Sequence, residues 1–200
     1  MSDKNYKERM MRKKAHIDKK ISEANIDKGV IVLLTGNGKG KSTSAFGMIC
    51  RALGYDMKVG MVKFLKGDQP SGEDHFLSQH KNIIIKHMRS GFTWDSQDKT
   101  HDIEKAKEAW EYALNFLEDP NIDLVVLDEL TYMLSYEYLP EEEVLKAISN
   151  SPAQQHIVIT GRNAKQSLIN IADTVSDVKE IKHAFNQQIK PKKVLIINCL

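Results

Sequence analysis

Residues 30–43 read VIVLLTGNGKGKST, an apolar run followed by a glycine-rich turn that leads into a segment with helical composition. A strand, a glycine-rich turn and a helix in this order form a P-loop, where backbone N–H groups and the helix N-terminus contact phosphate oxygens. Lys41 would neutralise phosphate charge, and the Ser42 hydroxyl would bind Mg²⁺. The candidate nucleotide-binding residues of this loop are Gly36, Asn37, Gly38, Lys39, Gly40, Lys41, Ser42 and Thr43.

The loop departs from the common pattern G-x-x-x-x-G-K-[ST] at its start. That pattern places a glycine at position 35, where this chain has Thr35, so the first glycine is Gly36 and the loop is one residue short. A glycine-rich turn that binds nothing is the alternative, and the flanking strand and helix argue against it. The short loop argues more against an ordinary ATPase than against triphosphate binding.

Composition sets broad limits on fold and partners. The 200 residues are enough for one domain with a core, and 41% hydrophobic with 28% charged residues is typical of globular proteins. A net charge of +2 gives no reason to expect a nucleic acid partner, and neither a membrane span nor a signal peptide is evident. Cys50 and Cys199 fit no metal-ligand spacing, and Cys50 is predicted to be a small core residue. These features predict a cytoplasmic protein with no membrane partner.

Apolar runs and helical patterns alternate along the chain. Strands are predicted at 29–34, 58–64, 82–87, 123–128 and 156–160, and helices at 41–53, 98–117, 140–148 and 164–172. This alternation predicts an α/β fold with a mostly parallel central sheet and helices on both faces. With the P-loop, it corresponds to the three-layer sandwich of RecA-like P-loop NTPases. Ligands in such folds bind beyond the carboxyl ends of the strands.

A second motif is the run VVLDE at residues 125–129. An apolar strand that ends in Asp128 and Glu129 would bring carboxylates to the edge where the phosphates bind, and these can hold Mg²⁺ directly or through water. The alternative is a strand end whose acids are only solvated. Glu129 could ligate the metal or, as in hydrolysing NTPases, orient a water molecule, and the sequence leaves both roles open.

Two large aromatic residues, Phe92 and Trp94, lie on a glycine-containing segment before the long helix. Aromatic side chains near a ligand edge can form a platform for a flat apolar ligand. They can equally tuck under the sheet edge and cover the core, and composition alone favours this second role.

The chain resembles the P-loop class of ATP:corrinoid adenosyltransferases over about residues 6–185. Seven motifs in family-like order carry the resemblance, and the short P-loop is the family's own form. In this sequence they are TGNGKGKST at 35–43, VKFLKG at 62–67, GFTW at 91–94, LDELTY at 127–132, ITGR at 159–162, ADTVS at 172–176 and KHAF at 182–185.

The resemblance implies that a cob(I) corrinoid, such as cob(I)alamin or cob(I)yrinic acid a,c-diamide, attacks the 5′ carbon of ATP and expels triphosphate. Lys41, the loop N–H groups and Mg²⁺, or Mn²⁺ in its place, would stabilise the leaving group. Ser42 and Glu129 are the first candidates for metal ligands, with Asp128 next, and Arg162 is a candidate nucleotide contact. This places the protein in adenosylcobalamin biosynthesis or salvage.

The resemblance also places Phe92 and Trp94 against the corrin, where they would displace the lower axial ligand and ease reduction of Co(II) to Co(I). This role then outweighs core packing. The electron would come from a reduced flavoprotein of the flavodoxin type, and the enzyme would be a homodimer.

Three segments are expected. Residues 1–28 are rich in Lys and Arg, with Tyr6, Met10, Ile17 and Ile21 near one helical stripe. They form either a solvated basic tail or, by resemblance, a helical lid over the corrin site of a second subunit. Such a lid would be disordered without ligand. Residues 29–186 form the P-loop domain. Residues 187–200 diverge from the family, and their apolar run could add an edge strand, pack on a partner or stay loose.

Two other functions remain open from the sequence. An ordinary P-loop ATPase or kinase would release phosphate or a phosphorylated product, whereas the transferase would release triphosphate. A non-catalytic nucleotide switch would bind ATP without turnover even when a cob(I) corrinoid is supplied.

Overall fold

A six-stranded parallel sheet forms the centre of the molecule, with strand order β3-β2-β4-β5-β1-β6. The computed structural model describes residues 3–65, 70–88 and 99–190. The strands are β1 (Ile31–Thr35), β2 (Val59–Lys63), β3 (Ile83–His87), β4 (Leu124–Asp128), β5 (His156–Thr160) and β6 (Thr174–Asp177). Five lie within one or two residues of their predicted ranges, and β6 is an additional strand.

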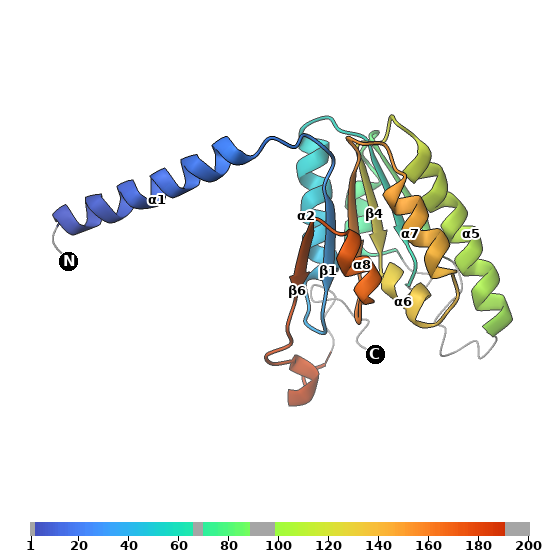
Figure 1. Cartoon of the computed structure of the whole chain (residues 1–200). Coiled ribbons are helices and arrows are strands. Elements are labelled where there is room, and N and C mark those ends of the chain that lie inside the picture. The colour runs from blue at the N-terminus through green and yellow to red at the C-terminus, as the bar shows by residue number, and fades with distance from the viewer. Residues whose placement is uncertain (1–2, 66–69, 89–98, 191–200) are drawn as a thin grey trace.

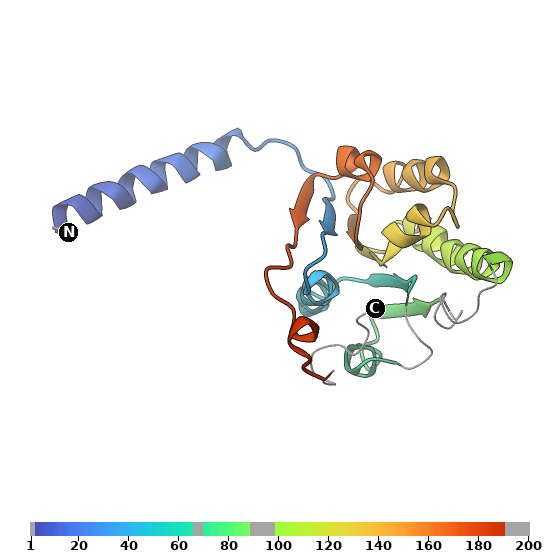
Figure 2. The same ribbon diagram turned by 90° about the horizontal axis from the view of Figure 1, so that it is seen from below.

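Helices cover both faces of this sheet, which confirms the predicted three-layer α/β sandwich (Figures 1 and 2). One layer holds α2 (Lys41–Gly54) and α3 (Gly72–Leu77), and the other holds α5 (Lys99–Glu118), α6 (Leu130–Ser135), α7 (Glu141–Ser149) and α8 (Gln166–Ile171). Of these, α3 and α6 were not predicted. None of the helices within the described ranges is long and apolar enough to cross a membrane.

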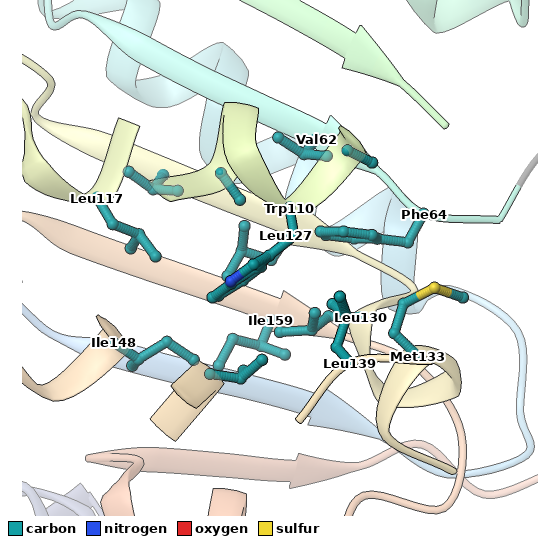
Figure 3. Close-up of a cluster of buried hydrophobic side chains, with 14 of the residues drawn as sticks. Val62, Phe64, Trp110, Leu117, Leu127, Leu130, Met133, Leu139, Ile148 and Ile159 are labelled. Atoms are coloured by element: carbon teal, nitrogen blue, oxygen red, sulfur yellow. The ribbon is translucent and has the colours of Figure 1, made fainter. Parts of the chain in front are cut away.

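The two faces of the sheet belong to separate hydrophobic clusters because side chains alternate along each strand. On β4, Val125 and Leu127 pack in the cluster under α5, whereas Leu124 and Val126 pack under α2. Figure 3 shows the first cluster, where the rings of Phe64 and Trp110 lie 6.4 Å apart between centroids. Burial on both faces explains why the central strands are nearly continuous apolar runs.

One prediction about a buried residue is wrong. Cys50 on α2 is exposed rather than part of the core. Cys50 lies three residues after Gly47 and four before Gly54, and both of these glycines are exposed. This spacing puts Cys50 on the outward stripe of α2, because residues three and four apart share one helical face.

Helix α1 (Asp3–Glu23) projects away from the rest of the molecule (Figures 1 and 2). Apart from the half-buried Met10, its side chains from residue 5 onward are exposed, including Tyr6, Ile17 and Ile21. The predicted 1–28 segment is therefore helical over most of its length.

The connection from α1 to β1 is fixed at the amino edge of the sheet. Lys28 forms an ion pair with Asp173 at 2.5 Å, and the second carboxylate oxygen of Asp173 accepts a hydrogen bond from the Ile31 N–H. Gly29 donates to the Ala153 carbonyl at 2.7 Å. Helix α1 thus departs from the edge opposite the P-loop.

At the other end of the chain, a 3₁₀ turn η1 (Ala184–Gln187) follows β6 and is closed by Gln188 in a left-handed conformation. The apolar run predicted as a possible edge strand belongs to residues 191–200, which lie outside the described ranges.

Candidate functional site

The P-loop connects β1 to α2 at the carboxyl edge of the sheet. Gly40 is the N-cap of α2 with φ 115°, a backbone conformation that side chains other than glycine rarely adopt. Lys41 and Ser42 follow in the first turn and are 6% and 9% exposed. The Lys41 ammonium donates to the Gly38 carbonyl at 2.9 Å, so the loop wraps around its own lysine.

The other two loop glycines are required by packing. A Cβ on Gly36, which has φ 98°, would lie 2.2 Å from the Asp177 carboxylate, and a Cβ on Gly38 would lie 2.6 Å from the Lys179 carbonyl oxygen. The Gly38 N–H donates to the Val178 carbonyl at 2.6 Å. The segment that leaves β6 therefore presses against the loop, and glycine is the residue that leaves room for it.

The acidic pair lies at the end of β4, two strands away from β1 across β5. Asp128 is fully buried, and its Oδ1 accepts a hydrogen bond from the Thr160 hydroxyl at 2.7 Å. Glu129 is the N-cap of α6 with φ 62° and ψ 24°, a left-handed conformation that costs on the order of 1–3 kcal/mol outside glycine. Its N–H donates to the Thr160 hydroxyl at 2.9 Å.

The charges of these elements act on one another. Burial has the largest effect on the pKa of Lys41 and lowers it. The negative charges of Glu129 and Asp128 raise this pKa, whereas the positive charges of Arg162 and Lys39 lower it further. The net pKa of Lys41 is lowered from its ordinary value of 10.5. The structure thus brings Lys41 and Lys39 from the P-loop near the acids after β4 and Arg162 after β5, and the roles of these residues stay predictions.

The donor set fits Mg²⁺ bound together with a nucleotide. Mg²⁺ usually keeps several waters and takes one or two carboxylates plus substrate phosphates, and it does not need an all-protein cage. Asp128 and Glu129 would supply the carboxylates, and Ser42 would supply a hydroxyl beside the glycine-rich turn. The described part of the chain contains no cluster of three or more His, Cys, Asp or Glu suited to a metal ion.

A buried ion pair lies at the same edge, on β2. Lys63 is fully buried, bonds to the Asp74 carboxylate and lies 4.8 Å from the Phe46 ring centroid. Asp74 also accepts from the N–H and hydroxyl of Ser71, the N-cap of α3. Because Lys63 pairs in register with Asp128, this network ties α3 to the strand beside the acidic pair.

Burial alone would raise the pKa of Asp74, but the hydrogen bonds and charge of Lys63 and the bonds from Ser71 outweigh it and lower the pKa below 3.8. Asp74 is therefore held as a carboxylate beside the Lys63 ammonium.

Sequence reasoning assigned no role to Thr160 or Lys63, although both carried a signal. Thr160 is a polar residue at the carboxyl end of a buried strand, the position that drew attention to Asp128, and Lys63 is a charged residue at the carboxyl end of the otherwise apolar β2. Phe92 and Trp94, the predicted corrin contacts, lie outside the described residues. Asn37, Lys39 and Thr43 are exposed on or next to the loop.

Comparison with known proteins gives consistent matches. The family model described as ATP:corrinoid adenosyltransferase BtuR/CobO/CobP matches residues 27–195. A corrinoid adenosyltransferase of Escherichia coli (strain K12) is 44% identical over 190 residues, which are 95% of this chain and 96% of that protein. One of Pseudomonas aeruginosa is 48% identical, covering 96% and 95%. The corrinoid adenosyltransferase CobA of Salmonella typhimurium is 42% identical, covering 95% and 96%.

Proposed function

The chain belongs to the ATP:corrinoid adenosyltransferase family and is an enzyme that adenosylates corrinoids with ATP, and we propose that it transfers the 5′-deoxyadenosyl group to a cob(I) corrinoid with release of triphosphate. One observation carries the proposal. The matched region contains a P-loop with a buried Lys41, and the charges of Glu129, Arg162 and Asp128 lie close enough to act on its ammonium group. In the transfer a Co–C bond forms and the C5′–O bond breaks. The electron pair of the broken bond leaves with the triphosphate.

The residues of the site have complementary tasks in this reaction. Lys41 and the N–H groups of the P-loop bind the triphosphate and stabilise the charge that grows on it as the bond breaks. Ser42, Glu129 and Asp128 hold Mg²⁺, which supplies further charge neutralisation when bound. Arg162 adds a second cation to the nucleotide side of the site. The cobalt nucleophile carries no proton, so the chain needs no general base for the transfer.

The phosphorus-containing product formed from ATP distinguishes this function from the two alternatives. Enzyme, ATP, Mg²⁺ and chemically reduced cobalamin are incubated, and the phosphorus products are identified. We expect inorganic triphosphate and adenosylcobalamin in equal amounts. Orthophosphate formed at the same rate without corrinoid would identify an ATPase with Glu129 as its water-orienting base, and ATP binding without any product would identify a nucleotide switch.

We also propose that α1 covers the corrin site of a second copy in a homodimer. Helices in proteins gain most of their stability from packing of an apolar face, and on α1 the side chains of Tyr6, Ile17 and Ile21 are exposed in the described part of the chain. The anchor of the helix at the amino edge through Lys28 and Asp173 directs it away from the P-loop of its own chain. Residues 29–186 then form the catalytic domain and 187–200 an appended tail.

The corrinoid must arrive as, or be reduced to, the Co(I) form, and we propose a reduced flavodoxin-like protein as the electron donor.

The cytoplasm is the compartment that we propose, since the exposed free thiol of Cys50 suits a reducing environment. The pathway would be the biosynthesis or salvage of adenosylcobalamin.

Replacing Phe92 or Trp94 by alanine should slow the reaction that starts from cob(II)alamin and a protein reductant by roughly tenfold or more, equivalent to about 1.4 kcal/mol of activation free energy. The reason is that both rings are proposed to displace the lower axial ligand and so ease reduction. The same variants should be close to the wild-type rate when cob(I)alamin is prepared chemically, because that step is bypassed. The two rates are measured by the absorbance of the product.

Two results would contradict this role. A parallel fall in both assays, together with a loss of thermal stability, would assign the aromatic residues to the core. A spectrum of wild-type enzyme with ATP and cob(II)alamin that contains only the five-coordinate species would exclude displacement of the ligand.

A further inference from the structure

We propose that Thr160 is a positioning residue that holds Asp128 and Glu129 in the arrangement that binds Mg²⁺ with ATP. The inference rests on the proposed function, because it assigns a task to the metal ligands named there. Thr160 itself is not expected to touch the metal or the nucleotide.

Thr160 lies between the P-loop after β1 and the acidic residues at the end of β4. It is the last residue of β5, which lies between β1 with its P-loop and β4 with its acidic end. Its backbone pairs in register with Leu34, and the preceding residue, Ile159, pairs with Leu127. The side chain is fully buried at the level of Asp128.

The hydroxyl group connects both acidic residues at once. It donates to Asp128 Oδ1 at 2.7 Å and accepts from the Glu129 N–H at 2.9 Å. A hydroxyl has one donor and two acceptor positions, so the two bonds are compatible. The first fixes the rotation of the Asp128 carboxylate, and the second fixes the backbone from which the Glu129 side chain projects.

Glu129 needs such support because its backbone is in the left-handed region, at φ 62° and ψ 24°. A non-glycine residue stays in this region only where its surroundings hold it. The Thr160 hydroxyl provides one such restraint at the first residue beyond β4, where the chain turns into α6.

Thr160 is in turn held from two sides. The N–H of the next residue, Gly161, donates to the Leu34 carbonyl at 3.1 Å. Gly161 has φ 143° and packs so closely on Thr131 that a Cβ would lie 1.9 Å from the Thr131 hydroxyl oxygen. The end of β5 is therefore fixed between β1 and α6, and the Thr160 hydroxyl has little freedom to move.

The test compares four variants in ATP binding without corrinoid, by calorimetry, with Mg²⁺ and with EDTA. Thr160→Val keeps the shape and removes the hydroxyl, and Thr160→Ser keeps the hydroxyl. Thr131→Val is a matched control, since Thr131 is equally buried and its hydroxyl has no hydrogen-bond partner among the described residues. Glu129→Gln serves as the reference for loss of a proposed ligand.

We expect Thr160→Val to reduce the gain in ATP affinity that Mg²⁺ provides on the order of 10- to 100-fold, as other losses of groups that orient metal ligands do. Affinity in EDTA should be unchanged, and Thr160→Ser should retain most of the gain. Thr131→Val removes a buried hydroxyl that bonds to neither acid, so it should retain the Mg²⁺-dependent gain whatever its effect on packing against Gly161. If Thr160→Val does not fold, Thr160→Ala takes its place with the same expectation.

Two outcomes would overturn the inference. One is a Thr160→Val protein with the full Mg²⁺-dependent gain. The other is an equal loss of affinity with Mg²⁺ and with EDTA, which would assign Thr160 a purely structural role. A wild-type enzyme in which Mg²⁺ gives no gain, or a full gain in Glu129→Gln, would instead refute the proposed metal ligands, so the two failures are distinguishable.

Discussion

Lys41→Ala is expected to lower the turnover of corrinoid adenosylation on the order of 10²-fold or more, as other losses of preorganised charge stabilisation do. The buried ammonium lies in the first turn of α2, beside the loop that we propose binds the triphosphate, so its loss removes a charge held in place there. The frame of β1 and α2 stays intact, since the side chain bonds only to the loop carbonyl of Gly38 in the described contacts. Turnover is measured with chemically prepared cob(I)alamin, so that reduction does not limit the rate.

Lys39→Ala is the graded control for this experiment. Lys39 carries the same charge in the same loop but is exposed, so solvent screens it and its loss should cost much less. A folded Lys41→Ala enzyme with near-normal turnover would remove the P-loop from the mechanism.

Lys63→Met should lower the free energy of unfolding by about 3–5 kcal/mol, the range for breaking one side of a buried ion pair. The methionine fills the space of the lysine stem, but the buried Asp74 carboxylate loses the lysine that bonds to it and keeps only the more distant His87, whose Nε2 lies 3.9 Å from Oδ1, among the described ion pairs. Urea unfolding at neutral pH measures the loss. The double variant Lys63→Met/Asp74→Asn should recover most of it, because the buried carboxylate that lost its lysine is then neutral as well.

The free energy of unfolding measured at low pH gives a second test of the Lys63–Asp74 ion pair. The pKa of Asp74 is lowered in the folded state, so its contribution to stability is complete above the ordinary value of 3.8 and is lost as the pH falls through the lowered folded value. Wild-type protein should therefore lose stability below about pH 3.8 more steeply than the double variant. A single variant that loses less than about 1 kcal/mol would show that the pair is solvated, as surface pairs are.

The sequence predicted the parts of the fold that local pattern decides. Buried parallel strands are apolar runs, so the ranges for β1, β2, β4 and β5 were found to within one or two residues. It missed β6, whose four residues are all exposed and carry no apolar pattern, because pairing with β1 alone defines that strand. It also missed α3, although Ser71 and Asp74 form a capping box that the spacing S-x-x-D signals.

The candidate site was predictable where a motif marks it, and less so where tertiary contacts make it. The P-loop and the acids after β4 are contiguous motifs, and the structure places Lys41, Asp128 and Glu129 within one another's electrostatic reach. The connection between Thr160 and Asp128 joins residues 32 positions apart, and no local pattern encodes it. The roles of Phe92 and Trp94 stay predictions, as both lie outside the described residues.

The close packing of Gly36 and Gly38 against residues 177–179 bears on how this family diverges. Both glycines are required by neighbouring backbone and side-chain atoms of the chain itself, in a structure that contains no nucleotide. A descendant that lost catalysis would therefore retain them under selection for folding alone, while Lys41 would be free to drift. In such a lineage, the identity of residue 41 would be the better marker of surviving activity, and an intact glycine pattern would be evidence of ancestry only.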